Sequence, residues 1–120
     1  MANQRSSTDV LQELTETRGV MTVVIIGRDG YPIEFSGDTT KIDVDGLGAT
    51  ISVMVDAAET TGEDLEIQPF EQVTLEYKGA VIAVVPVADA LLAVVSPDNK
   101  TLGMVRFKMK KFLPELAQFF

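Results

Sequence analysis

The 120-residue sequence contains no cysteine, no histidine and no tryptophan. Without cysteine the chain can form no disulfide framework and can perform no thiol chemistry. The lack of histidine removes the most frequent general base, the most frequent metal ligand and every Ser-His-Asp catalytic arrangement. A histidine- or cysteine-based enzyme is therefore excluded by composition alone.

Long apolar runs and an excess of basic residues are also absent. No apolar run approaches the roughly 18 residues of a membrane span, and residues 1–18 are polar, without a hydrophobic signal region. Ten basic residues against 18 acidic ones leave a net charge of −8, which argues against nucleic acid as the main partner. We expect a cytoplasmic protein without membrane insertion: one domain over residues 9–120, after a flexible leader of residues 1–8.

Residues 43–61 predict a single amphipathic helix with two uncharged faces. At roughly 100° per residue, one face is an apolar stripe typical of a helix packed on a core. The nearly opposite face carries small side chains, which would let a second backbone approach closely. We predict that this face packs on the same helix of a second copy; a helix buried on both sides within one domain is the alternative. The stripe contains Val44, Leu47, Ile51, Met54, Val55 and Ala58, and the small face contains Gly46, Ala49, Val53 and Ala57, with Thr50 and Thr60.

Five apolar or alternating stretches predict β-strands. The last three are joined by tight turns and must be antiparallel neighbours, and Pro32 places the second strand at a sheet edge. In the third strand, Val73, Leu75 and Tyr77 point to one face. The fourth strand is expected to stop at Pro86. The predicted strands are residues 20–26, 31–35, 70–78, 80–85 and 90–95.

Three helices complete the predicted order α-β-β-α-β-β-β-α. The first covers residues 9–18, capped by Ser7 or Thr8. Asp43 caps the central helix, which Gly62 ends. The last covers residues 102–120, and Pro114 should kink or restart it. We therefore predict an α+β domain with a five-stranded antiparallel sheet and helices on both faces.

No residue pattern predicts a catalytic residue, a cofactor or a metal site. Asp43-Val-Asp-Gly46 is similar to part of a calcium loop, but Lys41 and Ser52 would occupy its first and last ligand positions. Gly27-Arg-Asp-Gly30 leads into a strand rather than a helix, so it predicts a turn and not a phosphate loop. The basic residues of the last helix, with Phe107 outside its apolar stripe, predict a solvated face; an anionic membrane or an acidic partner is the alternative.

The order of these elements and their local patterns resemble the Roadblock / dynein light chain superfamily, and look most like its prokaryotic, MglB-type members. The similarity covers roughly residues 9–120. No single motif is diagnostic of the family. The resemblance rests on the order of the elements together with the residues that fill them. The matching stretches are LQELTETRGVMTVVIIGRDGYPI, DVDGLGATISVMVDAA and YKGAVIAVVPVADALLAVVSPDNKTLGMVRF.

The resemblance implies a Roadblock/profilin-like sandwich that forms dimers. Central helices would lie side by side, through Ala49, Val53 and Ala57, and residues 70–78 would pair with their counterpart in one continuous sheet. Family members have no catalytic residues of their own, and the prokaryotic ones bind and regulate small Ras-like GTPases. The alternatives are a scaffold dimer for a motor or signalling complex, and a small-molecule sensor. The expected dimer and partner contacts are Gly46, Ala49, Val53, Ala57, Thr60, Val73, Leu75 and Tyr77.

Overall fold

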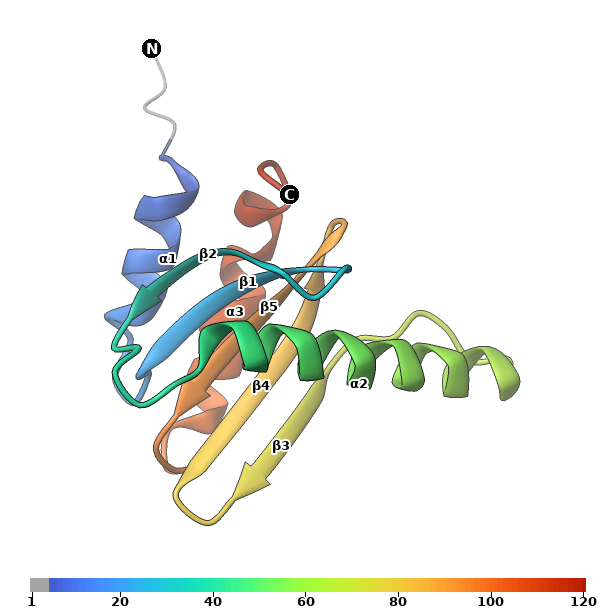
Figure 1. Cartoon of the computed structure of the whole chain (residues 1–120). Coiled ribbons are helices and arrows are strands. Elements are labelled where there is room, and N and C mark those ends of the chain that lie inside the picture. The colour runs from blue at the N-terminus through green and yellow to red at the C-terminus, as the bar shows by residue number, and fades with distance from the viewer. Residues whose placement is uncertain (1–4) are drawn as a thin grey trace.

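The computed structural model describes residues 5–120 as three helices around a five-stranded sheet (Figure 1). The elements follow the predicted order α-β-β-α-β-β-β-α. Their bounds are α1 Ser7–Thr15, β1 Thr22–Gly27, β2 Pro32–Gly37, α2 Val44–Asp64, β3 Val73–Tyr77, β4 Ala80–Val87, β5 Ala90–Ser96 and α3 Leu102–Leu116.

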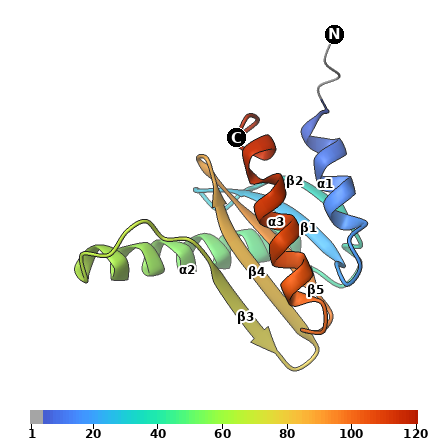
Figure 2. The same cartoon turned by 180° about the vertical axis from the view of Figure 1, so that it is seen from behind.

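The sheet is antiparallel throughout, in the order β2-β1-β5-β4-β3. Strands β2 and β3 lie at its two edges, which confirms the edge position predicted from Pro32. Helix α2 crosses one face of the sheet, and α1 and α3 cover the other (Figures 1 and 2). The predicted α+β class with helices on both faces is therefore confirmed.

Each face of the sheet has its own apolar core. Val23 and Ile25 of β1 belong to the core beneath α1 and α3, whereas Val24 and Ile26 belong to the core beneath α2. A strand in this position needs apolar side chains on both faces. This explains why β1 and its neighbour β5 are apolar at nearly every position.

Helix α1 begins earlier than predicted because Ser6 caps it, in place of Ser7 or Thr8. The Ser6 hydroxyl accepts a hydrogen bond from the Asp9 N–H, and the Asp9 carboxylate accepts one from the Ser6 N–H. This reciprocal capping box satisfies two amide groups at the start of the helix. Of the predicted leader, residues 1–4 lie outside the described part of the chain.

Two prolines leave their elements intact, contrary to the sequence-based boundaries. Strand β4 continues through Pro86, because β3 pairs only as far as Val84 and Pro86 has a strand on one side only. Helix α3 continues through Pro114 and ends at Leu116. Its proline lies in the last turn and leaves only the carbonyl of Lys110 without its helical donor.

The β1–β2 turn lies directly against α2. Gly30 in this turn has a φ of +92°, a conformation that favours glycine. A Cβ atom on Gly48 of α2 would clash with the carbonyl oxygen of Gly30, so the two backbones meet without a side chain between them. Arg28 of the same turn donates to Glu59, further along α2, at 2.7 Å. The turn is therefore held to α2 at two points.

An arginine links the two helices on the other face of the sheet. Arg5 donates to Glu13 of α1 at 2.9 Å and to Glu115 of α3 at 2.7 Å. The hydrogen bond from Arg5 lowers the pKa of the Glu115 carboxyl group. Folding therefore favours the ionised form of Glu115.

The contact between Gly48 and the turn predicts an unequal effect of two glycine substitutions. Gly48→Ala should destabilise the protein by about 1–3 kcal/mol, because the added methyl group overpacks a closed backbone contact. Gly103→Ala is the matched control on α3, where a Cβ atom meets nothing within 4 Å. That change should be neutral or stabilising by about 1 kcal/mol. Urea unfolding at one protein concentration measures both, and equal effects would contradict this role of Gly48.

The lowered pKa of Glu115 predicts how stability depends on pH. Its stabilising contribution should be complete above the usual carboxyl pKa of 4.5 and should disappear as the pH falls through the lower folded-state value. The melting temperatures of the protein and of Glu115→Gln should therefore differ most near neutral pH and converge in acid. A difference that stays constant over this pH range would show that the Arg5 contact is not its source.

Candidate interaction surfaces

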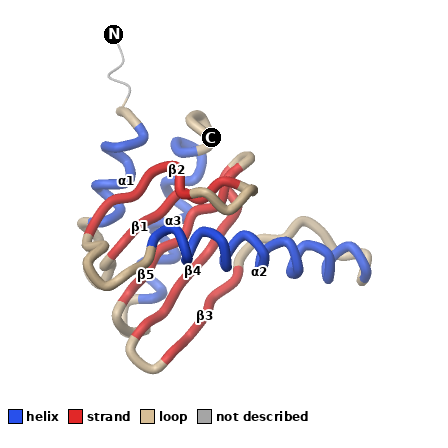
Figure 3. Tube along the Cα trace, in the orientation of Figure 1, coloured by secondary structure: helices blue, strands red, loops and turns tan. Residues whose placement is uncertain are grey.

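Helix α2 is longer than the sheet that it covers. Its buried residues, Gly48, Ile51, Ser52 and Val55, all lie in its first part. No residue of α2 beyond Val55 is buried, and this second part projects past the β3 edge (Figures 1 and 3). At 1.5 Å per residue, residues 56–64 span roughly 13 Å; Glu59 among them is still bonded to Arg28 of the β1–β2 turn. The predicted end at Gly62 is wrong, since α2 continues to Asp64.

The outer face of α2 is open to solvent within this chain. Val53 is 68% exposed, and Ala49, Ala57 and Thr60 are exposed beside it; Gly46 is half-buried. The alternative of a helix buried on both sides within one domain is therefore wrong. The predicted contact with a second copy stays a prediction.

The predicted residues of β3 lie at the sheet edge next to the projecting helix. Val73 and Leu75 are half-buried against the core beneath α2, and Tyr77 is 60% exposed. In the described part of the chain β3 pairs with β4 alone, so one side of its backbone has no strand partner. An exposed edge of this kind can pair with another chain.

An apolar hollow of about 500 Å³ opens beside the start of α2, between that helix and the hairpin of β3 and β4. Leu47 of α2 and Ile82 of β4 line it, together with Ile42 and Val95. Lys41 and Asp43 supply its charged rim. The hollow and the outer face of α2 together leave apolar surface uncovered on one side of the sheet.

A second exposed apolar surface lies on β2, and sequence reasoning missed it. Tyr31, Ile33 and Phe35 are 73%, 54% and 53% exposed; we call them the β2 strip. Phe35 pairs with Val24, so it lies on the α2 face of the sheet. On the other face Glu34 accepts hydrogen bonds from the hydroxyl groups of α1 residues. The sequence shows the alternation of apolar and polar residues along β2, but in the structure the large apolar residues are exposed and the polar ones are half-buried.

Arg28 and Arg106, the two arginines that follow residue 18, both make hydrogen bonds within the chain. Arg28 donates to Glu59 at 2.7 Å, and Arg106 of α3 donates to the Thr74 hydroxyl of β3 at 2.8 Å. Both guanidinium groups are therefore engaged inside the chain.

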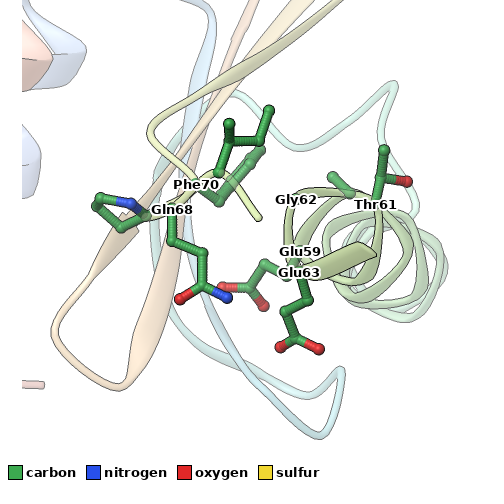
Figure 4. Close-up of a pocket in the computed structure, with 9 residues that line it drawn as sticks. Glu59, Thr61, Gly62, Glu63, Gln68 and Phe70 are labelled. Atoms are coloured by element: carbon green, nitrogen blue, oxygen red, sulfur yellow. The ribbon is translucent and has the colours of Figure 1, made fainter. Parts of the chain in front are cut away.

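A pocket of about 510 Å³ lies between the end of α2 and the segment that follows it (Figure 4). Glu59 and Glu63 of α2 and Gln68 and Phe70 of that segment line it. Among residues 5–120 no three Cys, His, Asp or Glu side chains are grouped as metal ligands. Over the same residues, no helix has the length and apolar character needed to cross a membrane.

Comparison with known sequences identifies a family and relatives. Residues 7–96 match the Roadblock/LC7 domain family. An uncharacterised protein of Methanocaldococcus jannaschii is 29% identical over 111 residues, which cover 92% of this chain and 93% of the relative.

Solved structures share the fold. MglB of Myxococcus xanthus superposes with a TM-score of 0.85 at 23% identity, over 92% of this chain and 91% of MglB. The gliding protein MglB of Thermus thermophilus has a TM-score of 0.83 at 20% identity, over 92% and 85% of the two chains. A Roadblock/LC7 domain from Streptomyces avermitilis has a TM-score of 0.85 at 14% identity, over 96% and 98%.

The family match spans residues 7–96, and the structural similarity to MglB of Myxococcus xanthus covers 92% of the chain. The chain therefore has a fold of the MglB type, and by the match to its family model it belongs to the Roadblock/LC7 domain family.

Proposed function

We propose that this chain is a non-enzymatic, dimeric binding module that docks a small Ras-like GTPase and regulates its nucleotide state. The observation that carries the proposal is the apolar surface left open on α2 and beside β3, in a domain whose two cores are otherwise filled. Family membership supports a regulatory or adaptor role. The absence of histidine and cysteine is in keeping with such a role.

The dimer would join two chains about a two-fold axis next to β3. The outer face of α2 would pack on the same face of its counterpart, and the free edge of β3 would pair with the second β3. The projecting part of α2 would then lie over the partner's sheet and cover its apolar hollow. A similar solved structure is described as MglB with a tetrameric arrangement, which supports self-association in this fold.

The β2 strip is the surface on which we place the GTPase. Ile33 and Phe35 of the strip lie on the opposite edge strand of the sheet from β3, so a dimer formed through β3 leaves them accessible. Tyr31, in the turn before β2, lies beside Ala49 of α2. Tyr31 and Phe35 offer large, rigid apolar contact areas of the kind that anchor protein interfaces. Arg28 and Arg106 are engaged within the chain, which favours acceleration of GTP hydrolysis by ordering the GTPase's own catalytic groups.

Val53→Glu tests the dimer. Two carboxylates would meet near the two-fold axis, so the protein should shift from a dimer to a single chain of 13.0 kDa in light scattering. Ile33→Glu introduces the same charge at an exposed residue on the opposite edge and should leave the dimer unchanged. A stable dimer of Val53→Glu would place the contact elsewhere.

Ile33→Glu and Phe35→Glu test the GTPase surface. Each should weaken binding by about tenfold or more, because a charge replaces an apolar anchor. Calorimetric titration against the small GTPases of the same genome, loaded with GDP or with a GTP analogue, measures the loss. Thr40→Glu, at an exposed position in the loop after β2, is the control. Undiminished affinity in both strip variants would exclude this surface, and equal affinity for the two nucleotide states would indicate a scaffold instead of a regulator.

A further inference from the structure

We propose that the outer face of α3 is a second docking surface, which binds an acidic protein segment. This face holds two exposed apolar side chains, Met104 and Phe107, with exposed fractions of 52% and 63%. Lys110 and Lys111 are exposed beside them, and Lys108 is half-buried. The cationic face, as we call these five residues, is distinct from both surfaces of the proposed dimer and GTPase complex.

The helical spacing brings these residues together. Met104, Phe107 and Lys111 recur at intervals of three and four residues, so they lie along one line of the helix. Val105 and Met109 lie on the opposite side and are buried in the core beneath α1 and α3. The two exposed apolar side chains thus cannot turn inward to that core, which its own residues already fill.

Charge distinguishes this face from the rest of the molecule. Residues 106–111 carry four of the ten basic residues of a chain whose net charge is −8. The one carboxylate of α3, Glu115, is bound by Arg5 at 2.7 Å. Within residues 5–120 the ion pairs are made by arginine, and no lysine takes part. Lys111 lies over the Phe112 ring, with its Nζ 5.8 Å from the ring centroid. The lysines of the cationic face therefore have no carboxylate partner among residues 5–120.

The position of α3 keeps the cationic face accessible in the proposed dimer. Helix α3 lies on the face of the sheet opposite to α2 (Figure 2). It reaches the β3 edge only through Arg106, whose guanidinium donates to Thr74, while Met104, Phe107, Lys110 and Lys111 are exposed. The inference does not depend on that dimer, because the cationic face belongs to a single chain.

The neighbouring helix favours a protein segment over an anionic membrane. Helix α1 covers the same side of the sheet, and Glu16, just after it, is exposed, as are Asp9 and Glu13 of the helix. Asp9 accepts from the Ser6 N–H and Glu13 is paired with Arg5, so Glu16 is the carboxylate of this group without such a partner among residues 5–120. A flat anionic bilayer in contact with α3 would also approach these carboxylates and be repelled by them. A peptide segment can follow α3 alone, over the roughly 22 Å of its length. Glutamate or aspartate side chains would pair with the lysines, and one or two apolar side chains would cover Met104 and Phe107.

A labelled peptide tests the proposal. The probe is a short fluorescein-labelled peptide of glutamate and leucine, with a second peptide in which glutamine replaces glutamate. Fluorescence anisotropy on the full chain should show binding of the acidic peptide, about tenfold weaker binding of the glutamine peptide, and loss of affinity at high salt. Vesicles of phosphatidylglycerol, added in place of the peptide, measure binding to an anionic membrane.

Two pairs of substitutions separate the cationic face from overall charge. The double variant Lys110→Glu, Lys111→Glu should lose about tenfold in affinity for the acidic peptide. The double variant Arg18→Glu, Lys78→Glu changes the net charge equally at exposed positions outside α3 and should bind like the unaltered protein. Phe107→Ser should weaken binding without any change in charge. Circular dichroism checks that each variant is folded.

Three results would overturn the proposal. They are no binding of the acidic peptide, an equal loss in both double variants, and binding of the vesicles without binding of the peptide. Each leaves the proposed dimer and GTPase surface untouched, because those are measured with other variants.

Discussion

Helix α2 is longer than the sheet beneath it is wide, and the exposed surfaces of the domain follow from this difference. The first part of the helix buries Ile51 and Val55 on the sheet. The second part extends beyond the sheet, beside the segment that follows it, and exposes a face of small side chains. Exposed apolar area is costly in water, at roughly 25 cal/mol per Å². The domain can therefore lower its free energy further by meeting a surface that continues its sheet, and the free edge of β3 lies where such a surface would begin.

The sequence predicted the elements well, because their periodicity reflects burial on one or both faces. β1 is the clearest case, since its alternate residues enter two different cores. The features that the sequence did not predict depend on residues that are distant in sequence and neighbours in the fold. Whether Pro86 ends β4 depends on where β3 stops pairing. Whether Gly48 is merely small or a close-contact residue depends on the carbonyl of Gly30. Local patterns contain neither fact.

The candidate surfaces were partly predictable, for a related reason. The small face of α2 was recognisable because a solvated helix would carry charged residues there, and Val53 is indeed open to solvent. The β2 strip was not recognised, because apolar residues at alternate positions normally turn inward. Here Glu34 occupies the inner side, held by hydroxyl groups of α1, and Phe35 remains outside. A polar helix partner thus reverses the usual orientation of an edge strand.

The contact between the β1–β2 turn and α2 has a thermodynamic consequence. The turn leads directly into the β2 strip, and the helix carries the proposed dimer face. Gly30 and Gly48 meet backbone to backbone, so no flexible side chain separates the turn from the helix at that point. If a partner that binds the β2 strip changes the free energy of dimer association, dimer association changes that partner's affinity by the same amount. Two ligand equilibria at opposite edges of the sheet would then be coupled reciprocally through one pair of glycines.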